Sequence, residues 1–331
     1  MKRIRASAGR TSAREASAST ADGMKVLLTG ATGFLGQELV RQLLAAGHQV
    51  RATVRRPAPG LAALGVETVK ASLLEPDSLQ PHFAGIEAVI HAAGGGKVVK
   101  IADMYTQNTD TTAGLVKAAR RAEIGTFILI SSLAARGPDG LGHPVSHYGR
   151  SKLLAEGIAL RQQQFPVTIL RPPGIYGPGD TRFGMLFRQV QRGIVPVPAP
   201  KDALSLVWGP DCAAAVIRML AHPPAHGRIY TVADGGIWSS EQILDLIASA
   251  LGHRPLKLPV PMALLSGLAG ASFAWGQLSG KPGFLTPDKI RDLAQARWTC
   301  DSGPIHRDLG WEATVRLPEG IERMAREGAR N

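Results

Sequence analysis

The chain has 331 residues, of which 44 % are hydrophobic, and a formal net charge of +12. This length accommodates one α/β domain and a smaller second one. Cys212 and Cys300 are too few and too far apart for a disulfide framework or a zinc site, so we expect no metal and a reducing compartment. Because no basic run with interleaved aromatic residues accompanies the charge, we expect a solvated basic surface and no nucleic-acid partner.

Residues 1–23 differ from the rest in composition. They are rich in Ala, Ser, Thr and Arg and contain no apolar segment of the secretory type. An Arg/Ser-rich, acid-poor stretch is typical of a transit peptide and equally of a disordered tail. Since Met24 stands where the fold would naturally begin, we expect residues 1–23 to be a disordered basic extension.

A glycine-rich turn follows the first expected strand, Lys25–Thr29. A helical pattern begins directly after it. The order strand, glycine turn, helix aims backbone N–H groups and a helix N-terminus at a pyrophosphate. The alternative is a glycine turn without a ligand. We predict dinucleotide binding by the residues of this turn: Gly30, Thr32, Gly33, Phe34, Leu35 and Gly36.

The end of the second expected strand, Gln49–Val54, bears on the choice of cofactor. In a dinucleotide fold this end meets the adenosine ribose, where an acidic side chain accepts from the 2′-hydroxyl and arginine suits a 2′-phosphate. Arg55 and Arg56 follow the strand, and no Asp or Glu occurs between Gln49 and Ala63. We therefore expect NADP(H) to be preferred over NAD(H), the alternative being two solvated arginines.

Three further strands are expected at Glu67–Ala71, Glu87–His91 and Thr126–Ser132. Small residues at the carboxyl end of such strands let a cofactor lie close to the backbone. We interpret His91 as a packing residue rather than a catalyst. The cofactor contacts expected at these strand ends are Ser72, Leu73, Ala92, Ala93, Gly94 and Ile130.

A tyrosine and a lysine one helical turn apart follow the Ser131–Ser132 strand end. Tyr148 and Lys152 are four residues apart, so both side chains lie on one face of a helix. A phenol can supply the proton that a carbonyl oxygen needs when hydride arrives at its carbon. Lys152 and an oxidised nicotinamide would favour the phenolate, and Ser132 would hold the substrate oxygen. The alternative is a Tyr–Lys pair on a solvated helix.

These residues carry a resemblance to a known family. The segment TGATGFLG, the Ser-Ser strand end and Tyr148-x-x-x-Lys152 resemble the extended short-chain dehydrogenase/reductases, or NAD-dependent epimerase/dehydratase family. Two more segments are similar to further signatures of that family: ILRPPGIYGPG at 169–179 and the C-terminal LGW at 309–311. The segment VRATVR at 50–55 resembles the NADPH-binding turn of dihydroflavonol reductases.

The resemblance implies a Rossmann-type α/β fold, a doubly wound parallel sheet with a smaller C-terminal substrate-binding domain. It implies a catalytic set of Ser132, Tyr148 and Lys152, supported by Asn108, with Tyr148 and Lys152 also contacting cofactor. Further cofactor contacts fall on the strand-six signature at Pro172, Gly174 and Ile175.

Two departures from the family pattern concern the substrate. Sugar-nucleotide dehydratases resemble this chain but carry Asp-Glu after the catalytic hydroxyl, where Leu133 and Ala134 stand here. Nucleotide-sugar epimerases carry a diphosphate-binding arginine that has no counterpart in residues 203–211. Both departures favour a less polar substrate.

The expected domains are a Rossmann domain at 24–175 plus 203–233 and a substrate domain at 176–202 and 234–331. We expect a sheet strand at Arg228–Val232 and a helix at Ser240–Leu251. Each aromatic residue in the second domain is more often packing than ligand contact. The substrate-pocket candidates besides Ser132 are Tyr176, Arg182 and Trp208, followed by Phe183 and Trp238.

Residues 258–280 contain no charged side chain. A helical stripe of larger residues is formed by Leu264, Leu268, Ala271, Trp275 and Leu278, and a small-residue face by Ala263, Gly267, Gly270 and Ala274. Small residues allow close packing, so we expect a buried or pocket-lining helix. The alternative is peripheral membrane contact, which resembles what steroid dehydrogenases of the superfamily do.

Taken together, the sequence predicts a cytoplasmic NADP(H)-dependent oxidoreductase. Its substrate would be a small-molecule ketone or secondary alcohol of moderate polarity, steroid-, terpenoid- or flavonoid-like. A nucleotide-sugar epimerase/dehydratase and a non-catalytic NADPH-binding subunit are the alternatives. The intact Ser132, Tyr148 and Lys152 set argues against the latter. Membrane association and a homodimer stay open.

Overall fold

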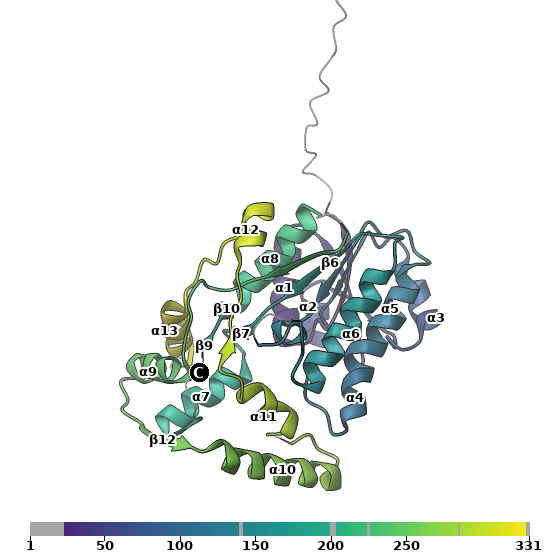
Figure 1. The fold of residues 1–331 in the computed structure, drawn as a ribbon. Coiled ribbons are helices and arrows are strands. Elements are labelled where there is room, and N and C mark those ends of the chain that lie inside the picture. Colours follow the sequence, from purple (N-terminus) through teal and green to yellow (C-terminus); the bar gives the residue numbers. More distant parts are fainter. Residues whose placement is uncertain (1–22, 139–141, 199–202, 224–225, 284, 329–331) are drawn as a thin grey trace, which may run out of the picture.

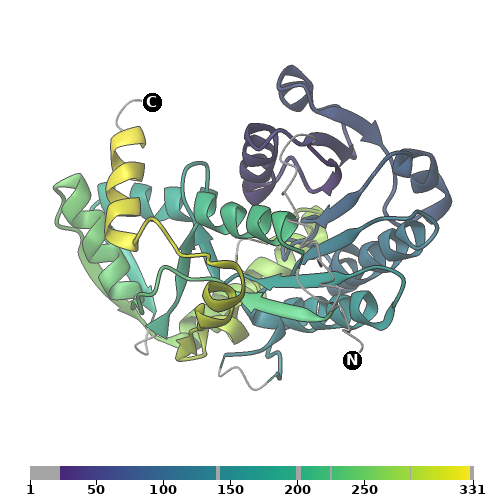
Figure 2. The ribbon, with the colours of Figure 1, turned by 90° about the horizontal axis from the view of Figure 1, so that it is seen from above.

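The computed structural model describes residues 23–331 except 139–141, 199–202, 224–225, 284 and 329–331. Residues 1–22, most of the expected N-terminal extension, lie outside the described residues. The centre of the molecule is a parallel sheet with helices on both faces (Figures 1 and 2). This is the doubly wound Rossmann-type architecture that the alternation of strand and helix predicts.

Seven parallel strands form the sheet, in the order β11-β6-β5-β4-β1-β2-β3. The order reverses between β1 and β4, which places a crevice at the carboxyl ends of these strands. The last strand of this sheet in chain order, β11, returns to lie beside β6, as predicted. The strands are β1 (Lys25–Thr29), β2 (Gln49–Val54), β3 (Glu67–Lys70), β4 (Ala88–His91), β5 (Thr126–Ile130), β6 (Val167–Arg171) and β11 (Arg228–Thr231).

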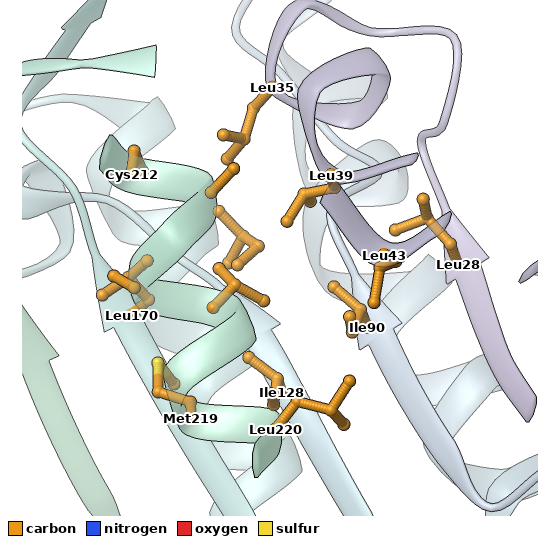
Figure 3. Close-up of a cluster of buried hydrophobic side chains, with 14 of the residues drawn as sticks. Leu28, Leu35, Leu39, Leu43, Ile90, Ile128, Leu170, Cys212, Met219 and Leu220 are labelled. Carbon is orange, nitrogen blue, oxygen red and sulfur yellow. The ribbon is translucent and has the colours of Figure 1, made fainter. Parts of the chain in front are cut away.

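Successive side chains of each strand enter two separate cores. Val26 and Leu28 of β1 face one side, where α1 (Phe34–Ala45), α8 (Gly209–Ala221) and α12 (Gly303–Leu309) pack; Figure 3 shows part of this core. Leu27 faces the other side, covered by α3 (Pro76–Leu79), α5 (Thr111–Ala119) and α6 (His147–Arg161). Because both faces are covered, the central strands β1, β4, β5 and β6 are buried almost throughout, whereas β3 at the edge of the sheet is half-exposed.

A third core lies beyond the carboxyl edge of the sheet. It contains Tyr176, Phe183 and Trp208, whose rings contact one another, with side chains of the surrounding helices. Three two-stranded pairs accompany it: β10 with β7, β12 with β8, and β13 with β9. The elements of this part are β7 (Gly174–Tyr176), α7 (Thr181–Gln191), β8 (Ile194–Pro198), β9 (Ala203–Leu204), β10 (Leu206–Trp208), α9 (Ser240–Leu251), β12 (Leu256–Val260), β13 (Arg297–Trp298) and α13 (Leu317–Gly328).

The remaining elements connect these layers or lie beside them. Among them, η2 is a π-helical turn inserted between α4 and α5. They are α2 (Pro59–Ala63), η1 (Gln80–Phe83), α4 (Ile101–Tyr105), η2 (Thr106–Asp110), η3 (Leu133–Ala135), α10 (Met262–Ser279) and α11 (Pro287–Leu293).

Most of the apolar segment at 258–280 forms a helix, α10, at Met262–Ser279, but the expectation that this helix is buried or lines the pocket is wrong. Trp275 is 70 % exposed and Leu278 is 83 % exposed. A Cβ atom at Gly267 or Gly270 would meet nothing within 4 Å, so the small-residue face is not packed either. Among the described residues, no helix has both the length and the apolarity needed to cross a bilayer.

Candidate active site

A cavity of about 630 Å³ opens at the carboxyl ends of β4, β5 and β6. Ala92, Ile130 and Pro172 line it from the sheet side. Phe183, Ile243 and Trp298 line it from the second part of the molecule. Most of the lining is apolar, and the polar side chains on it are Ser131, Ser132, Tyr148, Lys152, Arg182, Ser205, Ser240, Asp292 and Gln295. A cleft of this composition at this edge is where α/β sheets bind ligands.

The glycine turn before α1 has the geometry of a phosphate cradle. Gly30 has φ +77°, and a Cβ there would lie 2.6 Å from the nitrogen of Ala93. A Cβ on Gly36 would lie 2.0 Å from the carbonyl oxygen of Gly30. Gly33 precedes the helix without a side-chain cap, so the first-turn N–H groups keep no side-chain acceptor. These residues fit a dinucleotide pyrophosphate, for which Thr32, Phe34 and Leu35 complete the turn.

Ser132 and Tyr148 meet at the floor of the cavity. Ser132 follows β5, and its hydroxyl accepts from the nitrogen of Ala134 at 3.2 Å. The same hydroxyl lies close enough to the phenol of Tyr148 to lower the pKa of that phenol. Tyr148 stands in the first turn of α6. Asp288 of α11 accepts from the nitrogens of His147 and Tyr148 at 2.6 and 3.1 Å. A carboxylate at a helix N-terminus is favoured by the helix dipole, so α11 fixes the start of the helix that carries Tyr148.

Lys152 lies one turn further along α6 and is buried, with 6 % exposure. Its Nζ donates to the carbonyl oxygen of Ile130 at 3.0 Å, which leaves two N–H groups for other acceptors. Burial lowers the pKa of Lys152 to about 8, while Glu156 one turn below raises it. The lysine is therefore mostly an ammonium at neutral pH. Glu156 in turn pairs with Arg171 and accepts from Ser131.

The pKa of Tyr148 does not follow the expectation from the sequence. Burial raises it, the hydrogen bond with Ser132 and the charge of Arg182 lower it, and Asp292 raises it, with a net upward shift. The sequence predicted that Lys152 lowers the pKa of Tyr148, but Lys152 is not among the groups that shift this pKa. The net shift is upward because burial, which penalises the phenolate, outweighs the groups that lower the pKa of Tyr148. At neutral pH the phenol holds its proton, as a proton donor must.

Asn108 is placed to shape the backbone beside Lys152. It is buried in the π-helical turn, a distortion common at functional sites. Its amide accepts from the nitrogen of Gly95 at 3.0 Å and donates to the carbonyl oxygen of Gly95 at 2.9 Å and to Ser151 Oγ at 3.0 Å. A Cβ at Gly94, which has φ +129°, would lie 2.4 Å from Asn108 Oδ1. Asn108 therefore supports the glycine turn after β4 and the catalytic helix.

The remaining predicted cofactor residues divide into two groups. Leu35, Ala92, Gly94, Ile130, Pro172, Gly174 and Ile175 line the cavity with Tyr148 and Lys152. Arg55 and Arg56 are exposed at the carboxyl end of β2 and form no hydrogen bond or ion pair with the described residues. Ser72, Leu73 and Ala93 are half-buried beside the ends of β3 and β4. His91 is buried between Thr29 and Thr112, with its pKa lowered to about 3 chiefly by burial, which fits a packing role.

Of the predicted substrate contacts, Arg182 and Ser132 line the cavity and Tyr176 and Trp208 do not. Tyr176 is fully buried and Trp208 is 4 % exposed, both in the third core. Their aromatic rings pack because β7 and β10 pair side by side beneath the cavity wall. Arg182 bonds the carbonyl oxygen of Ile175 at 2.9 Å and pairs with Asp180. Of the second-choice residues, Phe183 lines the cavity and Trp238 does not.

Three carboxylates that the sequence reasoning missed surround the site: Glu156, Asp288 and Asp292. Glu156 could have been found, because it continues the four-residue spacing of Tyr148 and Lys152 on one face of α6. Asp288 and Asp292 lie on α11, and no local pattern in the sequence predicts that they reach the site. Burial raises the pKa of Asp292 to about 6, and its Oδ1 is covered without a hydrogen-bond partner among the described residues.

The fold and this constellation define an extended short-chain dehydrogenase/reductase. Residues 26–233 match the model of the NAD dependent epimerase/dehydratase family. The chain is 35 % identical over 288 residues to a ceramide reductase from Caulobacter vibrioides, covering 85 % of this chain and 87 % of the relative. It is 30 % identical over 327 residues to a UDP-glucose 4-epimerase from Vibrio cholerae, covering 91 % and 94 %.

A solved dTDP-glucose 4,6-dehydratase from Streptomyces venezuelae shares the fold with a TM-score of 0.75 and 20 % identity, over 93 % of this chain and 98 % of that one. The chain belongs to the NAD-dependent epimerase/dehydratase family. It is an NAD(P)-dependent enzyme of that family, whose relatives include reductases, dehydrogenases and epimerases.

Proposed function

We propose that the protein is an oxidoreductase that prefers NADP(H) and transfers a hydride between this cofactor and an apolar ketone or secondary alcohol. Ser132, Tyr148 and Lys152 would act at the reacting oxygen. The observation that carries the proposal is that Ser132, Tyr148 and Lys152 together line one largely apolar cavity. A steroid-, terpenoid- or flavonoid-like ketone suits this cavity, and the relative named ceramide reductase adds long-chain lipid ketones to the class.

The chemistry follows from the protonation states in the site. When bound, the nicotinamide supplies the hydride to the carbonyl carbon. Ser132 positions the substrate oxygen, and Tyr148 donates its phenolic proton to that oxygen as negative charge develops on it. Lys152, an ammonium at neutral pH, offers its two remaining N–H groups to the cofactor ribose and stabilises the phenolate that remains. Because burial raises the pKa of Tyr148, the phenol stays protonated until negative charge develops on the substrate oxygen.

We further propose that Gly30, Gly33 and Gly36 hold the pyrophosphate and that Arg55 and Arg56 hold the 2′-phosphate. Support comes from the close approach at the glycines and from the two exposed guanidinium groups without partners among the described residues. Residues 176–202 and 234–331 would form the substrate-binding domain beside the Rossmann domain at 24–175 plus 203–233. A homodimer stays a prediction, to be checked by light scattering.

The cavity wall argues against a nucleotide-sugar epimerase or dehydratase. Leu133 and Ala134 line the cavity where a dehydratase would need carboxylates. The one arginine on the described lining, Arg182, is already paired with Asp180. The 30 % identity to a UDP-glucose 4-epimerase keeps this activity as the second candidate.

The test is a screen of ketones with the purified protein and NADPH, followed by kinetics on the best substrate. Tyr148→Phe should lower turnover about 10²-fold or more while NADPH affinity is retained. Tyr230→Phe makes the same chemical change at a hydroxyl bonded to Asp308, outside the cavity, and should leave turnover unchanged. If Tyr148→Phe reduces a true substrate at the wild-type rate, the mechanism is wrong. If UDP-glucose is the substrate turned over, the epimerase is the function.

A further inference from the structure

The outer face of α10 is a continuous apolar surface. Leu264, Leu268, Ala271, Trp275 and Leu278, here called the apolar stripe, recur at intervals of three and four residues and so share one helical face. Leu264 is 56 %, Leu268 54 %, Trp275 70 % and Leu278 83 % exposed. Large apolar side chains gathered on one exposed face are typical of an interaction site rather than of ordinary solvent-facing surface.

The opposite face of α10 fixes the direction in which the stripe points. Ala269 and Gly276 are buried there, and the helix packs against α11. A Cβ on Gly276 would lie 2.9 Å from the carbonyl oxygen of Lys281, because the chain after the helix turns back against it. In Figure 1, α10 runs along the lower edge of the molecule, away from the central sheet. The stripe is therefore presented outward by a helix that is anchored on its inner side.

Lysines predominate at the C-terminal end of α10, where exposed Asp103 lies beside them. Lys257 before the helix, in contrast, is paired with Glu241 and Asp245. No Asp, Glu, Lys or Arg occurs between residues 258 and 280. Exposed Lys281 follows the helix directly. Gln277 donates to the carbonyl oxygen of Val99, which brings exposed Lys97 and Lys100 to the same end of the helix. Within the described residues none of these three lysines forms an ion pair. An apolar helical face with lysines at its border is the composition of a helix that lies in the interface of an anionic bilayer.

We propose that the apolar stripe of α10 docks the protein onto the surface of an anionic lipid bilayer, without spanning it. A second copy of the chain is the less favoured occupant. A two-fold interface would place the same patch on both sides, so that the three lysines would border the contact from both copies and would outnumber Asp103, the exposed carboxylate beside them. A bilayer instead offers apolar depth for the leucines and Trp275 and negative headgroups for the lysines.

The position of α10 links this surface to the cavity. α11 packs against α10 and contributes Asp292 and Leu293 to the cavity lining, with Leu293 44 % exposed. Val99, which bonds Gln277, lies four residues after Gly95, another lining residue. The bilayer would thus lie beside the rim of the cavity, where an apolar ketone can enter from lipid. This last step rests on the proposed function; the docking itself does not.

Vesicle flotation tests the docking without substrate or cofactor. One set of vesicles contains phosphatidylcholine alone, and the other an equal mixture of phosphatidylcholine and phosphatidylglycerol. The wild-type protein should float with the mixed vesicles, less with phosphatidylcholine, and lose binding at high salt. Leu264→Glu and Trp275→Glu should each lower the partition coefficient on the order of tenfold or more, because each removes apolar area and adds a negative charge.

Leu64→Glu is the matched control, since Leu64 is 57 % exposed outside α10 and should keep wild-type vesicle binding. Reduction of a water-soluble ketone should be unchanged in the α10 variants, while reduction of a ketone carried in vesicles falls with binding. Failure of the wild type to float with either vesicle overturns the docking. So does flotation that Leu264→Glu and Trp275→Glu leave intact, or a dimer in solution that these variants dissociate. Loss of all reductase activity with intact flotation overturns only the proposed function.

Discussion

Replacing Glu156 by glutamine should destabilise the protein and shift the pH dependence of the enzyme together. Glu156 is 2 % and Arg171 8 % exposed. Arg171 bonds the two carboxylate oxygens of Glu156 through Nε at 2.8 Å and Nη2 at 2.5 Å. A glutamine at this position would keep one acceptor oxygen and turn an amide donor toward the guanidinium. Arg171 would then be a buried charge without a counter-charge.

The expected loss in the free energy of unfolding is about 3 to 5 kcal/mol, the range for breaking one side of a buried ion pair. Glu156→Leu combined with Arg171→Met should cost less than the sum of the two single changes, because neither partner is then left charged. Glu156 also raises the pKa of Lys152. Without it that pKa falls below about 8, so the alkaline loss of activity should begin at lower pH.

Urea denaturation of Glu156→Gln at neutral pH measures the loss of stability, and urea denaturation of the wild type, Glu156→Leu, Arg171→Met and the double variant measures the coupling. A pH–rate profile of Glu156→Gln measures the second effect. Ser131→Ala is a control that removes one hydrogen bond to Glu156 and leaves the ion pair. A loss below about 1 kcal/mol for Glu156→Gln, the size of an ordinary hydrogen bond, would refute the reasoning on the buried charge. Additive single changes would refute the coupling.

Three further predictions concern the cofactor turn, the choice of cofactor and the cavity carboxylate. Gly36→Ala should abolish NADPH binding or folding, because its Cβ would lie 2.0 Å from the oxygen of Gly30. Gly60→Ala is the control: its Cβ would meet nothing within 4 Å, so calorimetry and cofactor titration should give wild-type values. Arg55→Ala with Arg56→Ala should reduce the preference for NADPH over NADH on the order of tenfold or more, and equal dissociation constants in the wild type would contradict this prediction. Relative to the wild type, Asp292→Asn should gain about 1.5 kcal/mol of stability on going from about pH 5 to about pH 8. A carboxyl whose folded pKa is raised from 3.8 to about 6 costs the wild type stability as the pH rises from about 4 to about 6, and about half of the full cost of about 3 kcal/mol arises above about pH 5; urea denaturation of both proteins at both pH values checks the sign.

Local patterns in the sequence determined the framework of the site. Short apolar runs bounded by Gly, Pro and polar residues predicted the strands, and β2 begins and ends at the predicted residues, Gln49 and Val54. The spacing of Tyr148 and Lys152 placed both on one face of α6, and the glycines at 30 and 36 marked the close approach of backbone at the turn. These features depend on residues within one element or one turn, so the sequence contains them in full.

Contacts between distant segments decided the rest. Asp288 caps α6 from 140 residues away, and its partner is a backbone N–H group, which has no signature in the sequence. Tyr176 and Trp208 turned into a separate core although their chemistry suits a substrate pocket equally well. Contacts between distant segments likewise decided that the apolar stripe of α10 faces solvent. An apolar side chain gains free energy when it is buried, and this follows from the sequence. The packing of other elements decides whether the side chain is buried, and against which residues.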